Sequence, residues 1–115
     1  MSEQMQSSIS VVIANGASLS GVALLGGSTV VGLVMPSSWT AADLTFQASH
    51  DGATHNNLYD GLGTEVTVTA AASRYIALDP AVFASIRNLK IRSGTSGTPV
   101  NQGGARTITL VTRPV

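Results

Sequence analysis

Short runs in which hydrophobic and polar residues alternate recur along this chain. In residues 88–93, Leu89 and Ile91 alternate with Lys90 and Arg92. Because successive side chains of a β-strand point to opposite faces, this period of two indicates a strand with one buried face. We expect Leu89 and Ile91 to face the core, and Lys90 and Arg92 to face the solvent.

Runs rich in Val, Ile, Thr and Leu are separated by pairs such as Asn15-Gly16 and Asp51-Gly52, which tolerate the positive φ of tight turns. They predict strands at about residues 8–14, 19–25, 29–35, 44–49, 65–70, 74–78, 88–93 and 106–112. Short helical turns are expected at residues 37–42 and at Asp79-Pro80, where the aspartate can cap a turn that begins with proline. The predicted fold is all-β, an antiparallel, jelly-roll-like β-sandwich.

The length of 115 residues fits one domain, and 43% hydrophobic residues with 10% charged ones can form a folded core. We expect an N-terminal arm at residues 1–10 and a single sandwich domain at residues 11–115. The chain has no cysteine, so neither disulfides nor cysteine-bound zinc can stabilise it. Packing must provide the stability instead.

Charged residues are unevenly distributed, although the formal net charge is zero. No Lys or Arg precedes Arg74, and residues 4–42 contain no charged side chain. A neutral chain lacks the excess of basic residues that gives phosphate binding its affinity, so nucleic acid is not an expected partner. Residues 22–35 are apolar but interrupted by Gly, Ser and Thr, so no membrane span is expected. We interpret this distribution as that of a protein packed against neighbours.

Candidate catalytic groups are few. The only histidines, His50 and His55, lie near Asp51 in residues 49–57, where they could bind a metal ion, although a solvated hairpin tip explains the same residues. No nucleophile motif accompanies them, and the glycines of residues 94–97 lead to another loop rather than to a helix that could bind phosphate. We therefore predict neither an enzyme nor a cofactor.

Two segments and one basic face are candidate contacts with other proteins. Residues 93–105 form a long connector, and long loops in compact domains are often functional. We expect the arm and this connector to lie on neighbouring chains. The basic side chains either meet an acidic patch of a partner or form a solvated sheet face. The residues expected in these contacts are Arg87, Lys90, Arg92, Arg106, Thr95, Asn101, Gln102, Gln4 and Gln6.

Aromatic residues are scarce: Trp39, Phe46, Tyr59, Tyr75 and Phe83. Sugar-binding sandwiches stack sugars on exposed rings, whereas a chain with so few rings is expected to use most of them in its core. We expect Trp39 to plug the core or an edge of the sandwich. Carbohydrate binding through Trp39 or Tyr59 is the alternative function.

Several segments together resemble the small β-sandwich virion proteins of tailed bacteriophages and prophages. The resemblance spans most of the chain and is carried by residues 33–42, 44–49 with Asp51-Gly52, 89–95, 99–102 and 106–113. It implies a structural protein of the virion that decorates or cements the capsid surface. Such a protein is present in many copies, contacts the major capsid protein and associates with like copies as trimers. Related sandwiches also occur as tail and fibre modules, so a carbohydrate-binding module of a tail or fibre is the alternative.

Overall fold

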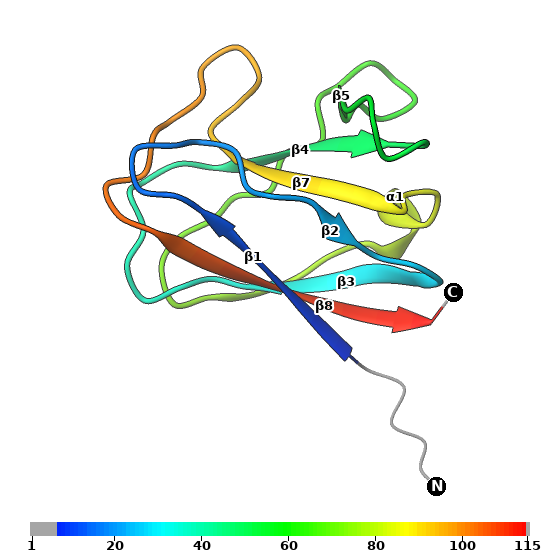
Figure 1. Cartoon of the computed structure of the whole chain (residues 1–115), viewed down its shortest axis with the longest axis horizontal. Helices are drawn as coiled ribbons and strands as arrows, with labels where there is room; N and C mark the ends of the chain where they lie inside the picture. Colours follow the sequence, from blue (N-terminus) through cyan, green and yellow to red (C-terminus); the bar gives the residue numbers. More distant parts are fainter. Residues whose placement is uncertain (1–6, 115) are drawn as a thin grey trace, which may run out of the picture.

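The computed structural model describes residues 7–114, which form two four-stranded antiparallel sheets packed face to face (Figure 1). Sheet A has the strand order β1-β8-β3-β6, and sheet B has the order β2-β7-β4-β5. The strands are β1 Ser7–Ile13, β2 Ala23–Leu24, β3 Ser28–Val34, β4 Leu44–Ser49, β5 Asn56–Asn57, β6 Tyr75–Ala77, β7 Asn88–Ser93 and β8 Arg106–Pro114. The predicted all-β sandwich is confirmed.

The core lies between the two sheets and is formed by the alternate residues of their strands. Leu89 and Ile91 of β7 are fully buried, as their alternation predicted. Fully buried partners come from both sheets, namely Ile13, Val30, Leu33, Leu44, Phe46, Ile108 and Leu110. The rings of Phe46 and Phe83 meet edge to face with their centroids 5.3 Å apart, a favoured geometry for an aromatic pair. Packing of this kind is the main source of stability in a chain without disulfides.

One of the two predicted helical turns is present. Helix α1, Pro80–Phe83, begins after Asp79, whose carboxylate accepts a hydrogen bond from the Ala81 N–H. Residues 37–42 are not helical, because the Thr40 N–H and C=O are hydrogen-bonded to the side-chain amide of Gln102. Among residues 7–114, no helix has the length and apolar character of a membrane span.

The strand predicted at residues 19–25 is present only in part. Near its start, the Ser20 hydroxyl accepts a hydrogen bond from the Ile91 N–H, so a side chain takes the place of a backbone acceptor. Main-chain pairing resumes at β2, where Ala23 lies opposite Leu89. The side chain of Ser20 thus divides one predicted strand into an isolated bridge and a short strand.

The strand predicted at residues 65–70 is replaced by isolated bridges. Val68 pairs with Leu44 and Glu65 with Tyr59, while Asn56–Asn57, not predicted, forms β5 against β4. Val66 and Val68 nevertheless pack against the core. Residues 7–10 of the expected arm belong to β1, and residues 1–6 lie outside the described residues.

Candidate functional site

The predicted basic face is not a single patch. Arg87 is exposed and Lys90 is half-buried, both at sheet B, whereas Arg106 begins β8 in sheet A. Arg92, expected to face the solvent, is only 6% exposed. That expectation was wrong for Arg92, although the strand alternation that produced it was right. The side chain points away from the core but is covered by other segments of the chain.

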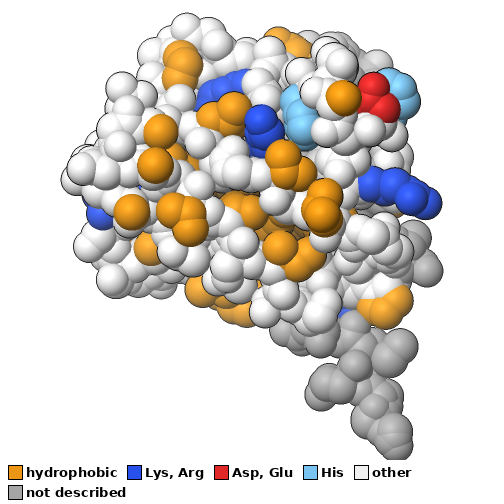
Figure 2. Space-filling model, in the orientation of Figure 1, with side chains coloured by type: hydrophobic (Ala, Val, Ile, Leu, Met, Phe, Trp, Pro, Cys, Tyr) orange, Lys and Arg blue, Asp and Glu red, His pale blue; other side chains and the backbone are white. Residues whose placement is uncertain are grey.

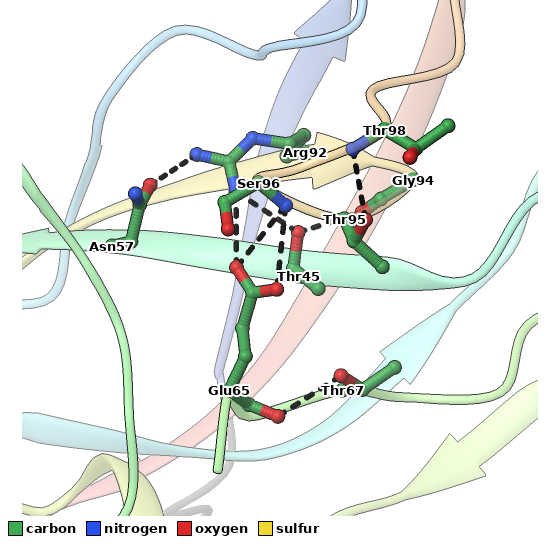
Figure 3. Close-up of polar contacts among 9 residues, drawn as sticks. All are labelled: Thr45, Asn57, Glu65, Thr67, Arg92, Gly94, Thr95, Ser96 and Thr98. Atoms are coloured by element: carbon green, nitrogen blue, oxygen red, sulfur yellow. Dashed lines mark hydrogen bonds and ion pairs between the residues drawn. The ribbon is translucent and has the colours of Figure 1, made fainter. Parts of the chain in front are cut away.

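Arg92 lies in a buried network of polar side chains (Figure 3). Its Nη1 is 3.3 Å from Oε2 of Glu65 and donates a hydrogen bond of 3.2 Å to the Thr45 hydroxyl. Its Nη2 donates to the side-chain oxygen of Asn57. The side chains of Arg92 and Glu65 are 7% and 15% exposed, so the ion pair is largely shielded from water. A buried charge is tolerated only when it is paired and hydrogen-bonded in this way.

Glu65 joins two loops that lie over sheet B. Glu65 lies in a hairpin, opposite Tyr59, and the next residue, Val66, donates its N–H to the Leu58 carbonyl. Its carboxylate also accepts hydrogen bonds of 3.2 and 3.3 Å from the Ser96 N–H, in the connector. Arg92 and Glu65 therefore hold the hairpin and the connector against the sheet, and neither charge is left for a partner.

Gln102 was predicted as an interface residue and is instead 1% exposed. Its Oε1 accepts from the Thr40 N–H at 2.8 Å and from Arg106 Nε at 3.1 Å. Its Nε2 donates to the Thr40 carbonyl at 3.0 Å and to the Ser93 hydroxyl at 2.7 Å. With four hydrogen bonds its amide is fully used inside the fold, so the prediction for Gln102 was wrong.

The connector is held by its own chain. The Gly94 N–H donates to the Asp43 carbonyl at 2.7 Å, and the Val100 N–H donates to the Ser93 carbonyl at 2.8 Å. Of the residues predicted there, Asn101 is exposed and Thr95 is half-buried, so both can still be reached by another protein. The predicted arm residues Gln4 and Gln6 lie outside the described residues.

The candidate metal loop is a hairpin between β4 and β5. Asp51 does not point toward a shared site with the histidines, because its Oδ1 accepts from the Ser49 hydroxyl and from the Ala53 and Thr54 N–H groups at 2.9–3.0 Å. Across the described residues, no three His, Asp or Glu side chains are grouped as metal ligands would be. The Nε2 atom of His55 is buried without a hydrogen-bond partner, and the ring is otherwise half-buried.

We predict that Asp51 makes the stability of the protein depend on acidity. The N–H groups of Thr54 and Ala53 and then the Ser49 hydroxyl hold the pKa of Asp51 well below its ordinary value. Since the folded pKa is depressed, the stabilisation is complete above the unfolded pKa of about 3.9 and is lost as the pH falls toward the folded value. Denaturation at several pH values should show wild type more stable than Asp51→Asn near neutrality, with the difference shrinking below this pH. An unchanged difference in acid would contradict the prediction.

The exposed aromatic rings do not gather at one sugar-sized pocket. Trp39 packs against the core, and its indole N–H donates to the Ala42 carbonyl at 3.0 Å. Tyr59 is 51% exposed on the hairpin beside sheet B, and Tyr75 is 63% exposed on sheet A. A hollow of about 240 Å³ opens at the β5 end of the sandwich, lined by residues that include Leu58. Its volume is below the usual range of small-molecule sites.

The outer side of sheet A is a surface that sequence reasoning found only in part. We call it the uncharged face. Strand register places its residues in rows across the sheet, and Tyr75 leans over Gly32, where an added Cβ would lie 3.1 Å from its ring. The face comprises Ser8, Ser10, Val12, Gly32, Val34, Tyr75, Ala77, Thr107, Thr109 and the buried Val111, and the exposed Arg113, next in the alternation of β8, marks its end. The alternating threonines of β8 are visible in the sequence, but joining the other strands to them requires the sheet order.

The charged residues of sheet A lie around the uncharged face: Arg74 precedes β6, and Arg106 and Arg113 lie near the two ends of β8. In the view of Figure 2, most of the visible Lys, Arg, Asp and His side chains lie in the upper half of the molecule, over the loops of sheet B. In comparisons with known proteins, no family model, no curated protein and no solved structure matches this chain. The functional argument therefore depends on the geometry of these surfaces.

Proposed function

We propose that this chain is a structural protein of a phage virion that decorates or cements the capsid through its surfaces. The observation that carries the proposal is the uncharged face of sheet A. Its residues are small, hydroxylated or apolar, and Val12, Val34 and Tyr75 are between 36% and 63% exposed. A surface of this kind can be buried against another protein without removing charges from water.

The internal polar network supports the same proposal. The hydrogen bonds of Arg92, Glu65 and Gln102 hold loops against the sandwich. Loops that are already ordered lose little conformational entropy when a partner binds, which favours association through preformed surfaces. The resemblance to phage virion proteins supplies the partner, the major capsid protein. The proposal includes no catalytic residue.

A capsid-binding experiment tests this proposal. Purified chain is added to capsids assembled without it, and the bound amount is measured after sedimentation. Val34→Lys places a charge in the uncharged face and is expected to reduce occupancy strongly, because the ammonium group must be desolvated. Thr54→Lys adds the same charge on the exposed β4–β5 hairpin and should bind like wild type. Equal occupancy by both variants would contradict a role for the face.

The alternative function is a carbohydrate-binding module of a phage tail or fibre. Its best support is Tyr59, which is exposed beside the polar outer side of sheet B. Calorimetric titration with simple sugars separates the two proposals. The capsid proposal predicts no saturable heat, whereas saturable binding that is lost in Tyr59→Ala would favour the module.

A further inference from the structure

The four sheet edges of this sandwich differ in how they are protected. At one edge of sheet A, β6 has only three residues and is preceded by Arg74. Sheet B ends in β2 and β5, which have two residues each. Short edge strands and flanking charges are the usual devices that prevent a sheet from pairing with another chain.

The remaining edge, β1, has none of these devices. It runs for seven residues, Ser7–Ile13, without a charge, a proline, a glycine or a bulge. β1 is hydrogen-bonded to β8 along one side. Along its other side, it makes no backbone hydrogen bond to any described segment. A strand of this length leaves a row of N–H and C=O groups that can template a further strand.

The surroundings of β1 are also free of charge. β1 and β2 are in contact, so the edge of sheet A and the edge of sheet B lie on the same side of the sandwich, toward the viewer in Figure 1. On β2 and just before it, Leu24 is 70% exposed and Val22 is 41% exposed. Both lie within residues 4–42, the stretch without a charged side chain. Exposed apolar side chains beside an open strand edge indicate a surface that is covered by another protein.

We propose that β1 pairs antiparallel with β1 of a second copy of this chain, joining the two A sheets into one sheet of eight strands. A second copy is the occupant that the charge pattern favours, because two uncharged edges meet without repulsion and each satisfies the other's backbone groups. None of the other edges is long enough to accept β1 over its whole length. The contact is therefore between identical strands, with a twofold axis.

Symmetry also determines the register of the pair. In a pair of antiparallel strands related by a twofold axis normal to the sheet, only one residue lies directly opposite its own copy. If all seven residues of β1 are to overlap, that residue must be the middle one, Ser10. Ser8 then lies opposite Val12 of the other copy, and Ile9 lies opposite Val11. Ile9, which is only partly buried in one copy, gains a hydrophobic neighbour.

This inference adds a contact between like copies to the proposed function, but it depends only on the strand edge. It gives dimers, whereas the resemblance to phage proteins implies trimers. The isolated protein can be tested without capsids. Dimers that do not bind capsids would leave the inference intact and overturn the proposed function, and monomers that bind capsids would do the reverse.

Disulfide trapping tests both the pairing and the register, because the natural chain has no cysteine. Ser10→Cys places two thiols on opposed residues about 5 Å apart between Cα atoms, within disulfide reach. Thr109→Cys is the matched control, because Thr109 is the neighbour of Ser10 on β8 and on the same face. Its copies would be three strand spacings apart, about 14 Å, beyond disulfide reach. Under mild oxidation, we expect a covalent dimer from Ser10→Cys alone. Equal yields, or none from either variant, would overturn the proposal.

Charge exchange provides a second test. Wild type should show the mass of a dimer by light scattering, and Ser10→Lys should show that of a monomer, because two lysines then face each other. Mixing Ser10→Lys with Ser10→Glu should restore the dimer, since opposite charges now pair. Restoration would also show that both variants are folded. A monomeric or trimeric wild type, or a mixture that stays monomeric, would contradict the inference.

Discussion

Replacing Glu65 by alanine is expected to lower the free energy of unfolding by about 3 kcal/mol, the cost of leaving a buried charge without its partner. The Arg92 guanidinium would keep its hydrogen bonds to Thr45 and Asn57 but would lose its counter-charge. The Ser96 N–H would also lose its acceptor. Urea denaturation monitored by circular dichroism measures this loss.

The double variant Arg92→Met with Glu65→Ala is the matched control. It removes both charges, and Thr45 remains satisfied because its hydroxyl also donates to the Gly94 carbonyl at 2.6 Å. We expect the double variant to be more stable than Glu65→Ala, because an apolar side chain of similar length leaves no buried charge. If Glu65→Ala costs less than about 0.5 kcal/mol, as an ordinary surface change does, the network does not have the role assigned to it.

Replacing Gly94 by alanine is the second change for which we expect a large effect, a loss of about 3 kcal/mol from backbone strain and steric overlap together. Gly94 has a φ of 88°, in the left-handed region, and an added Cβ would lie 2.5 Å from the Thr98 carbonyl oxygen and 2.7 Å from the Val100 nitrogen. Both contacts are with backbone atoms, so no side-chain rotation can relieve them.

Gly97 is the matched control for this change, because it lies in the same loop. It has no positive φ, and nothing lies within 4 Å of the position of its added Cβ. Gly97→Ala should therefore leave the unfolding free energy within about 0.5 kcal/mol of wild type. Thermal denaturation of the two variants side by side provides the measurement. Similar melting temperatures would show that the connector is not held as described.

Most of the fold could be predicted because its signals are local. Alternation identified β7 correctly, and Asp79 followed by Pro80 identified α1. The strands that were missed or divided depend on distant partners. The Ser20 hydroxyl interrupts one strand by accepting a hydrogen bond from Ile91, and residues 37–42 are held out of a helix by Gln102. No local pattern contains the information that these partners are near.

The candidate surfaces were harder to predict for the same reason. Alternation correctly assigned Arg92 to the outer side of sheet B. A side chain on the outer side of a sheet need not be exposed, however, and Arg92 is buried because Glu65 lies above it. The uneven charge distribution was the more useful signal. Residues 4–42 include β1 and β3 of sheet A and β2 of sheet B, so both strands at the open edge of the sandwich are free of charge. Strand order was needed to see this.

The copy number of this chain in purified phage particles tests the proposed function most directly. Quantitative mass spectrometry of particles from a phage that encodes the chain gives its ratio to the major capsid protein. A decoration or cement protein, which works by repeated surface contacts, should be present in numbers comparable with the major capsid protein. A few copies per particle, as for a tail or fibre module, would contradict the account.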